Sequence, residues 1–165
     1  MRVDEDPPVA LARGTGAASP RGRVINNVLL ATDLSPVSAD ATDEAIGLAS
    51  ALDARLVIVN VIDTRQGLAG GLLPGVRASR VDQLRADRER GLRPVVERAM
   101  RAGVDATFLV WTGEPGQSIV AAADAEHADL VVVGTRALDR AGRFLLGSVS
   151  DYVVNHSTCP VLVAR

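Results

Sequence analysis

Residues 128–150 read ADLVVVGTRALDRAGRFLLGSVS, and this stretch decides the fold. Residues 130–133 are continuously apolar, as expected of a parallel strand that is covered on both faces. The run stops at Gly134, where the missing side chain lets a ligand approach the backbone. Gly147 and Ser148 then open a predicted helix, with Ser148 as its N-cap. Because the free amides of a helix's first turn attract anions, the stretch predicts a phosphate site.

Predicted strands and helices alternate outward from this stretch. The predicted strands cover residues 27–32, 56–61, 106–111, 130–133 and 161–163. Helices are predicted between them, and the first has Ser35 as N-cap and Pro36 in its first position. Because helices that join parallel strands cross over with one handedness, this pattern predicts an α/β fold, a doubly wound parallel sheet with helices on both faces.

The first predicted helix carries an apolar face that we expect to pack on the sheet. Its members recur at helical spacing and are Val37, Ala41, Ala45, Ala49 and Leu52. The second predicted helix, residues 79–102, contains Gly91 and Pro94. Since proline removes a donor and crowds the preceding turn, we expect a kink or a break there.

Two segments show no regular pattern. Residues 1–23 mix proline and glycine with small and charged residues, which predicts a disordered tail before a domain that spans residues 24–165. Residues 67–75 are rich in glycine and predict a mobile excursion near the site.

Composition bounds the class of protein. With 165 residues, of which 47% are hydrophobic and 2% aromatic, the chain suffices for one domain with an aliphatic core. No apolar run approaches the roughly 20 residues that span a bilayer, and the first ten residues are acidic where a signal peptide is basic. The single cysteine, Cys159, agrees with a reducing compartment. We therefore expect a cytoplasmic protein without a membrane partner.

Charge and residue types exclude several kinds of site. The formal net charge of −2 gives no overall attraction to nucleic acid. All 18 basic residues are arginine, which excludes a P-loop lysine, a kinase strand lysine and a pyridoxal Schiff base. His127 and His156 lie in no metal-ligand pattern, and no nucleophile is paired with a base. We therefore expect no catalytic residues and, at most, slow hydrolysis of a phosphate compound bound at the predicted site.

The spacing of the glycines resembles that of the nucleotide-binding branch of the universal stress protein family. The signature of this branch is glycine, two residues, glycine, nine residues, and then Gly-Ser or Gly-Thr. Here the anchors are Gly134, Ala137 and Gly147-Ser148, so alanine replaces the middle glycine. The pieces VLLATDLSP, VIVNVID, GEP and CPVLVAR follow in the family's order. The resemblance covers residues 27–165 and implies five parallel strands in the order 3-2-1-4-5, with a switch point between strands 1 and 4.

The resemblance also implies the residues of an adenine nucleotide site. Ala31, Thr32 and Asp33 would line the nucleoside, and the main chain of Val61 would meet adenine. The wall for the ribose and phosphates would comprise Val133, Gly134, Ala137, Gly147, Ser148, Val149 and Ser150. Taken alone, Asp33 is equally well explained as a cap between loop and helix. If the family's middle glycine is left-handed, Ala137 costs roughly 1–2 kcal/mol, or about tenfold in affinity.

The function implied by the resemblance is that of an ATP-binding regulator of the stress response, in which Mg²⁺ or Mn²⁺ bridges the phosphates. A nucleotide-free dimeric interaction module of the same fold and a cyclic AMP binder are alternatives. An adenylylating enzyme is disfavoured, because no Ser-Gly-Gly-x-Asp-Ser loop follows the first strand. The apolar residues 159–164 form the edge strand in the implied order, and an open apolar edge predicts a homodimer through this strand.

Overall fold

The computed structural model describes residues 24–65, 74–135 and 146–164. Its strands are β1 (Asn27–Ala31), β2 (Arg55–Asp63), β3 (Ala106–Gly113), β4 (Leu130–Gly134) and β5 (Val161–Ala164). Its helices are the 3-10 turn η1 (Pro36–Ser38), α1 (Ala39–Leu52), α2 (Pro74–Arg101), α3 (Pro115–Ala125) and α4 (Ser148–His156). The predicted tail, most of the predicted glycine-rich excursion and Ala137 lie outside the described residues.

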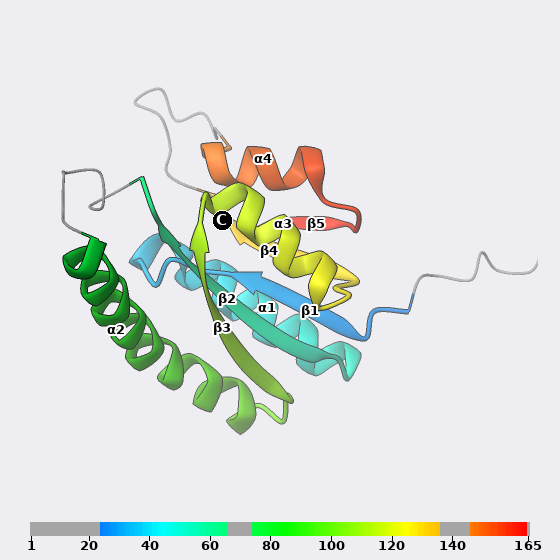
Figure 1. Ribbon diagram of the computed structural model, residues 1–165. Coiled ribbons are helices and arrows are strands. Elements are labelled where there is room, and N and C mark those ends of the chain that lie inside the picture. Colours follow the sequence, from blue (N-terminus) through cyan, green and yellow to red (C-terminus); the bar gives the residue numbers. More distant parts are fainter. Residues whose placement is uncertain (1–23, 66–73, 136–145, 165) are drawn as a thin grey trace, which may run out of the picture.

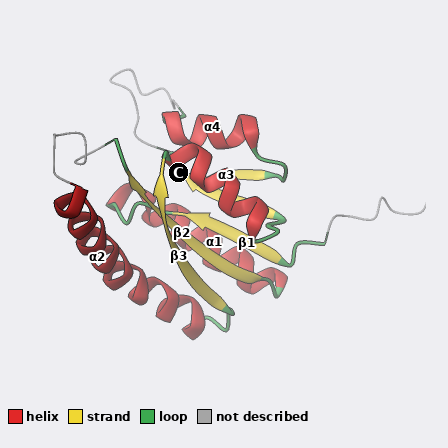
Figure 2. Ribbon diagram, viewed as in Figure 1, coloured by secondary structure: helices red, strands yellow, loops and turns green. Residues whose placement is uncertain are grey.

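The five strands form one parallel sheet in the order β3-β2-β1-β4-β5, which confirms the predicted fold class and strand order. Helices α1 and α2 cover one face, and α3 and α4 cover the other (Figures 1 and 2). Residues 28–30 of β1 are fully buried, as expected of a central strand between two layers of helices. The chain leaves β1 toward α1 and enters α4 after β4, so the sheet's switch point lies between these two strands.

Helix α1 confirms only part of the predicted apolar face. Ala41, Ala45 and Ala49 are fully buried against the sheet, whereas Val37 is 51% and Leu52 is 43% exposed. Val37 lies in η1, a 3-10 turn with three residues per turn, so the α-helical spacing that predicts it on the same face as Ala41 does not apply to it. Leu52 is the last residue of α1, where the chain leaves the helix through a left-handed cap.

Helix α2 runs without a break through Gly91 and Pro94, so of the kink or break that the sequence predicts the break is absent (Figure 1). Leu92 and Ala99 lie on either side of Pro94 and are fully buried, which holds both halves of the helix on the sheet. Pro94 is exposed, and so is Arg90, whose carbonyl loses its helical partner. Because water can satisfy that carbonyl, proline costs less here than it would in a buried turn.

Candidate functional site

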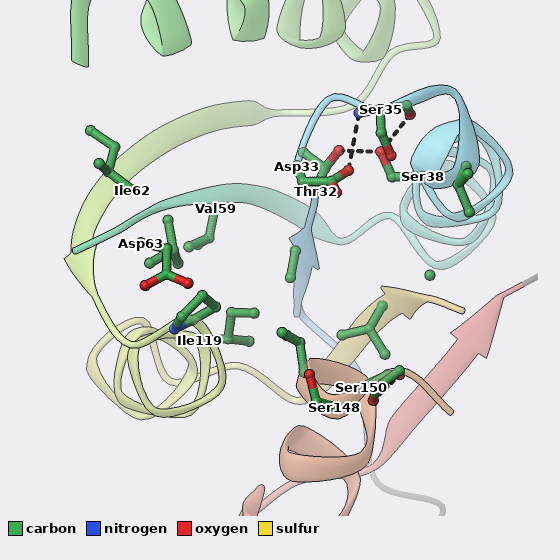
Figure 3. A pocket seen from close by; sticks show the side chains of 18 of the residues that line it. Thr32, Asp33, Ser35, Ser38, Val59, Ile62, Asp63, Ile119, Ser148 and Ser150 are labelled. Carbon is green, nitrogen blue, oxygen red and sulfur yellow. Dashed lines mark hydrogen bonds between the residues drawn. The ribbon is translucent and has the colours of Figure 1, made fainter. Parts of the chain in front are cut away.

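A pocket opens at the carboxyl ends of the strands, at the switch point between β1 and β4 (Figure 3). Its volume of about 400 Å³ is within the range of small-molecule sites. Ten of the eleven residues predicted for the site line this pocket, and the eleventh, Ala137, is outside the described residues. The lining residues that the sequence did not indicate are Ser35, Val37, Ser38, Val59, Ile62, Asp63, Arg65, Leu84, Arg88, Pro115, Ile119 and Thr135.

The loop after β1 forms one wall of the pocket, and buried hydroxyl groups hold its shape. Ser38 Oγ donates to the carbonyl oxygen of Ser35 at 2.9 Å. Since a hydroxyl has a single hydrogen, Thr32 Oγ1 must be the donor in its 2.9 Å bond to Ser38 Oγ. Thr32 Oγ1 in turn accepts from the backbone N–H of Leu34 at 3.1 Å. The hydroxyl hydrogen of Thr32 is therefore used inside the loop.

Asn60 of β2 ties this loop to the sheet, and the sequence analysis missed it. Its Nδ2 donates to the carbonyl oxygen of Thr32 at 2.8 Å, and the residue is only 1% exposed. Its Oδ1 is buried with no hydrogen-bond partner among the described residues. The signal was available, because Asn60 interrupts the apolar run of β2 and a polar group in such a strand needs partners.

Asp33 and Leu34 complete the wall. The carboxylate of Asp33 accepts from the backbone N–H of Ser35 at 3.0 Å, so this side chain does cap the loop, while it also lines the pocket. Leu34 has a φ of +63°, which is uncommon for a residue with a Cβ. The other two described non-glycine residues with positive φ, Asp53 and His127, follow the ends of α1 and α3. Leu34 is thus the one of the three that lies at the pocket loop.

The N-terminus of α4 forms a second wall. Gly147 is the N-cap, and the predicted N-cap Ser148 is instead the first helical residue, so that assignment was wrong by one position. The reason is that the carbonyl of Gly147 already accepts the first helical bond, from Asp151 N at 2.8 Å. The N-cap is a glycine and has no side chain that could cap this end, and among the described residues no side chain bonds to the amides of the first turn. Ser148 is exposed, whereas Ser150 is buried and donates its hydroxyl to the carbonyl of Gly147.

The backbone requires glycine at neither end of this wall. A Cβ on Gly134 would lie 3.6 Å from the Cβ of Ala41 and 3.7 Å from the Cα of Ser38, which are ordinary contacts. Gly147 has φ −64° and ψ 156°, values that any residue can adopt. The conformation of the chain therefore does not explain why glycine stands at these two positions.

The third side of the pocket is apolar and ends in an ion cluster. Val59, Val61, Ile62, Pro115 and Ile119 supply the apolar surface. Beyond them Arg65 contacts Asp63 through two nitrogens, at 3.1 and 3.2 Å, and Glu114 at 3.2 Å. The Arg65 guanidinium holds the pKa of Asp63 below its usual range. Because Glu114 is also the N-cap of α3, the cluster joins the end of β2 to that helix.

Neither a metal cluster nor a membrane span is found in the described part of the chain. No three His, Cys, Asp or Glu side chains in these ranges are grouped so that they could hold a metal ion. Among the same residues, no helix combines the length and the apolar character needed to cross a bilayer.

Comparisons with known proteins agree on one family. A profile of the universal stress protein family matches residues 25–165. Universal stress protein YxiE of Bacillus subtilis is 35% identical over 150 residues, which cover 86% of this chain and 100% of that protein. UspA from Lactobacillus plantarum superposes with a TM-score of 0.73 at 25% identity, over 86% of this chain and 98% of that one. A universal stress protein solved in complex with cAMP gives 0.65 at 31% identity, over the same shares.

The family profile spans most of the chain, and the match to YxiE covers 86% of it. The resemblance seen in the glycine spacing and the four flanking pieces is therefore confirmed. The chain belongs to the universal stress protein family.

Proposed function

We propose that the pocket binds an adenine nucleotide, ATP in particular, and that its occupancy regulates the protein. The observation that carries the proposal is that one pocket joins the uncapped N-terminus of α4 to the apolar surface of β2 and α3 (Figure 3). Helix N-terminal amides attract phosphate, and a flat base fits an apolar surface. A ligand with one anionic end and one aromatic end matches both sides of the pocket.

The predicted residues then take separate roles. Val61 and the exposed carboxylate of Asp33 would contact the nucleoside, next to Ala31 and Thr32. The phosphates would lie at the α4 wall, against Gly134, Val133 and the residues 147–150. Arg88 of α2 also lines the pocket and makes no ion pair with another described residue, so it adds a positive charge that a phosphate can balance. Ala137 would complete the same wall.

A divalent cation, Mg²⁺ or Mn²⁺, would accompany ATP. The described residues offer no cluster of side chains for a resident metal ion. Such a cation would therefore be held by phosphate oxygens and water, with few ligands from the protein, as Mg²⁺ commonly is in nucleotide sites.

Calorimetric titration with ATP and magnesium tests this function. We expect one site per chain, and affinity that falls when the cation is chelated. Absence of binding in the micromolar range would favour the alternative, a nucleotide-free interaction module of the same fold.

Cyclic AMP is the second candidate, because a relative 31% identical to this chain was solved with it. Competition between the two ligands separates them. ATP should bind more tightly, since its triphosphate places more negative charge at the amides of α4. Tighter binding of cyclic AMP would assign that nucleotide instead.

We further propose that the chain forms a homodimer through β5. Within the described residues, β5 pairs only with β4, and its other edge is open. The carbonyls of Pro160 and Ala164 bond to β4, so by alternation the backbone groups of Val161 and Val163 point to the open edge. Pairing between two copies would satisfy them.

Val163→Pro tests the dimer directly. Proline there removes an outward N–H and leaves the β4 ladder in place. We expect light scattering to shift from dimer toward monomer at micromolar concentration. Leu162→Lys is a less specific change, because Leu162 packs against the core beside α1. A wild-type protein that is monomeric at that concentration would contradict the dimer.

A further inference from the structure

We infer that Gly91 of α2 is a positioning residue for the pocket, acting through Leu34, and that occupancy of the pocket is thereby coupled to α2. The effect on ligand affinity rests on the proposed nucleotide site. The contact itself lies between the strained residue of the β1 loop and the middle of a helix that is 57 positions away in sequence.

Leu34 links the pocket wall to the core. Its neighbours Asp33 and Ser35 both line the pocket, while its own side chain is partly buried against the core beside α1 and α2. Its left-handed backbone, at φ +63°, is unfavourable for a residue with a Cβ and persists only where the surroundings fix it. The packing of this side chain therefore acts together with the hydrogen bonds of the loop to hold the two residues that face the ligand.

Gly91 provides the space into which Leu34 fits. A Cβ on Gly91 would lie 2.6 Å from Cδ1 of Leu34, closer than two carbon atoms can approach. Glycine inside a helix is disfavoured relative to alanine, and at position 91 the contact with Leu34 gives it a packing reason. Gly47 of α1 is a useful contrast, because a Cβ there would meet nothing within 4 Å.

Helix α2 also contacts the pocket directly. Leu84 and Arg88 line it, and together with Gly91 they follow a spacing of four and then three residues, which places all three on one face of the helix. A ligand that fixes the β1 loop therefore acts on α2 through Leu34 as well as through these two side chains. By linkage, if ligand binding shifts the conformation of α2, then a change that shifts α2 must in turn alter the affinity for the ligand.

The first experiment compares Gly91→Ala with the matched control Gly47→Ala, using ATP and magnesium as the probe. Both changes favour the helix, but Gly91→Ala also crowds Leu34, so Gly47→Ala should not lower Tm, and any loss of Tm in Gly91→Ala measures the cost of that contact. Because the terminal methyl of Leu34 must shift, we expect Gly91→Ala to bind ATP roughly three- to tenfold more weakly, and Gly47→Ala to bind like the wild type. In the Leu34→Ala background, where the crowded methyl is gone, Gly91→Ala should have no further effect. A loss of the same size in that background would show that the effect does not pass through Leu34 and would overturn the inference.

The second experiment needs no ligand and so separates the coupling from the proposed function. The amides of Leu34 and Ser35 donate to Thr32 Oγ1 and Asp33 Oδ1, and hydrogen exchange reports on both bonds. Gly91→Ala and Leu34→Ala should each speed exchange at Ser35, while Gly47→Ala should not. If the wild type fails to bind ATP but exchange responds in this way, the nucleotide site is wrong and the coupling stands. Wild-type exchange in Gly91→Ala overturns the coupling, whether or not ATP binds.

Discussion

The two polar walls of the pocket are built in opposite ways. The loop after β1 has a left-handed leucine, and its hydroxyl groups bond to one another and to the backbone. The start of α4 has ordinary dihedral angles, an exposed Ser148 and amides without a side-chain cap. The loop wall thus uses its polar groups to keep a shape, whereas the α4 wall leaves Ser148 and its first amides available to a ligand. Mutations of these polar groups should therefore affect mainly stability at the first wall and mainly affinity at the second.

The largest effect on affinity is expected from Gly147→Val at the α4 wall. Valine tolerates the φ and ψ of Gly147, so the domain should still unfold cooperatively, with a loss on the order of 1 kcal/mol for a poorer cap. Its branched side chain would occupy the approach to the helix amides, and we expect ATP affinity to fall by roughly 100-fold. Titration and thermal unfolding measure the two effects. Unchanged ATP affinity in this variant would show that the site is assigned to the wrong surface.

The next largest effect is expected when one hydroxyl is removed from each wall and the stabilities of the two variants are compared. Thr32→Val leaves the partly buried amide of Leu34 without its acceptor and removes the bond that Ser38 Oγ accepts, although Ser38 still donates to Ser35, and it should cost about 1–3 kcal/mol of unfolding free energy. Ser148→Ala changes an exposed group and should leave stability within about 0.5 kcal/mol of the wild type.

For ATP affinity we expect the opposite order, with the larger loss from Ser148→Ala and not from Thr32→Val. Ser148→Ala should weaken ATP binding by roughly three- to tenfold, the value of one hydrogen bond, without a change in Tm. Denaturant titration and calorimetry on both variants make the comparison. The contrast between the two walls would be contradicted if Ser148→Ala lowered the unfolding free energy more than Thr32→Val does.

The smallest effect concerns the third side of the pocket. Arg65 lowers the pKa of Asp63, so the charged carboxylate stabilises the fold above its unfolded pKa of about 4, and this contribution disappears as the pH falls through the lower folded value. The difference in unfolding free energy between wild type and Asp63→Asn should therefore be constant above about pH 5 and shrink below about pH 4. It should be small throughout, because Arg65 is largely exposed. A difference that persists in acid would mean that shape and not charge organises this side.

Sequence patterns predicted most of the fold, because hydrophobic runs and helix start signals are local. The five strands, their parallel arrangement and the start of the first helix at Pro36 follow from such signals and are confirmed. The errors fall where packing overrides a local rule. Pro94 does not break α2, because buried residues on both sides hold the helix in place, and Gly147 replaces Ser148 as N-cap.

The candidate site likewise contains residues that the sequence indicated and residues that it did not. The family resemblance, which is readable along the chain, implied eleven site residues, and the fold brings the ten that are described to one pocket. Asn60, Ser38 and the ion cluster of Asp63, Arg65 and Glu114 were not indicated, because their roles depend on partners distant in sequence or on side-chain direction.

The sequence by itself determined the alternation of strands and helices, the family, and the two segments that meet at the switch point. Each of these depends on residue order and on periodicity, which are properties of the chain before it folds. Only the tertiary structure decided which polar groups of the pocket are already satisfied and which remain open, and that Leu34 fits against Gly91. Hydrogen bonding and steric contact are short-ranged in space, so residues far apart in sequence acquire them only when the sheet and its helices have packed.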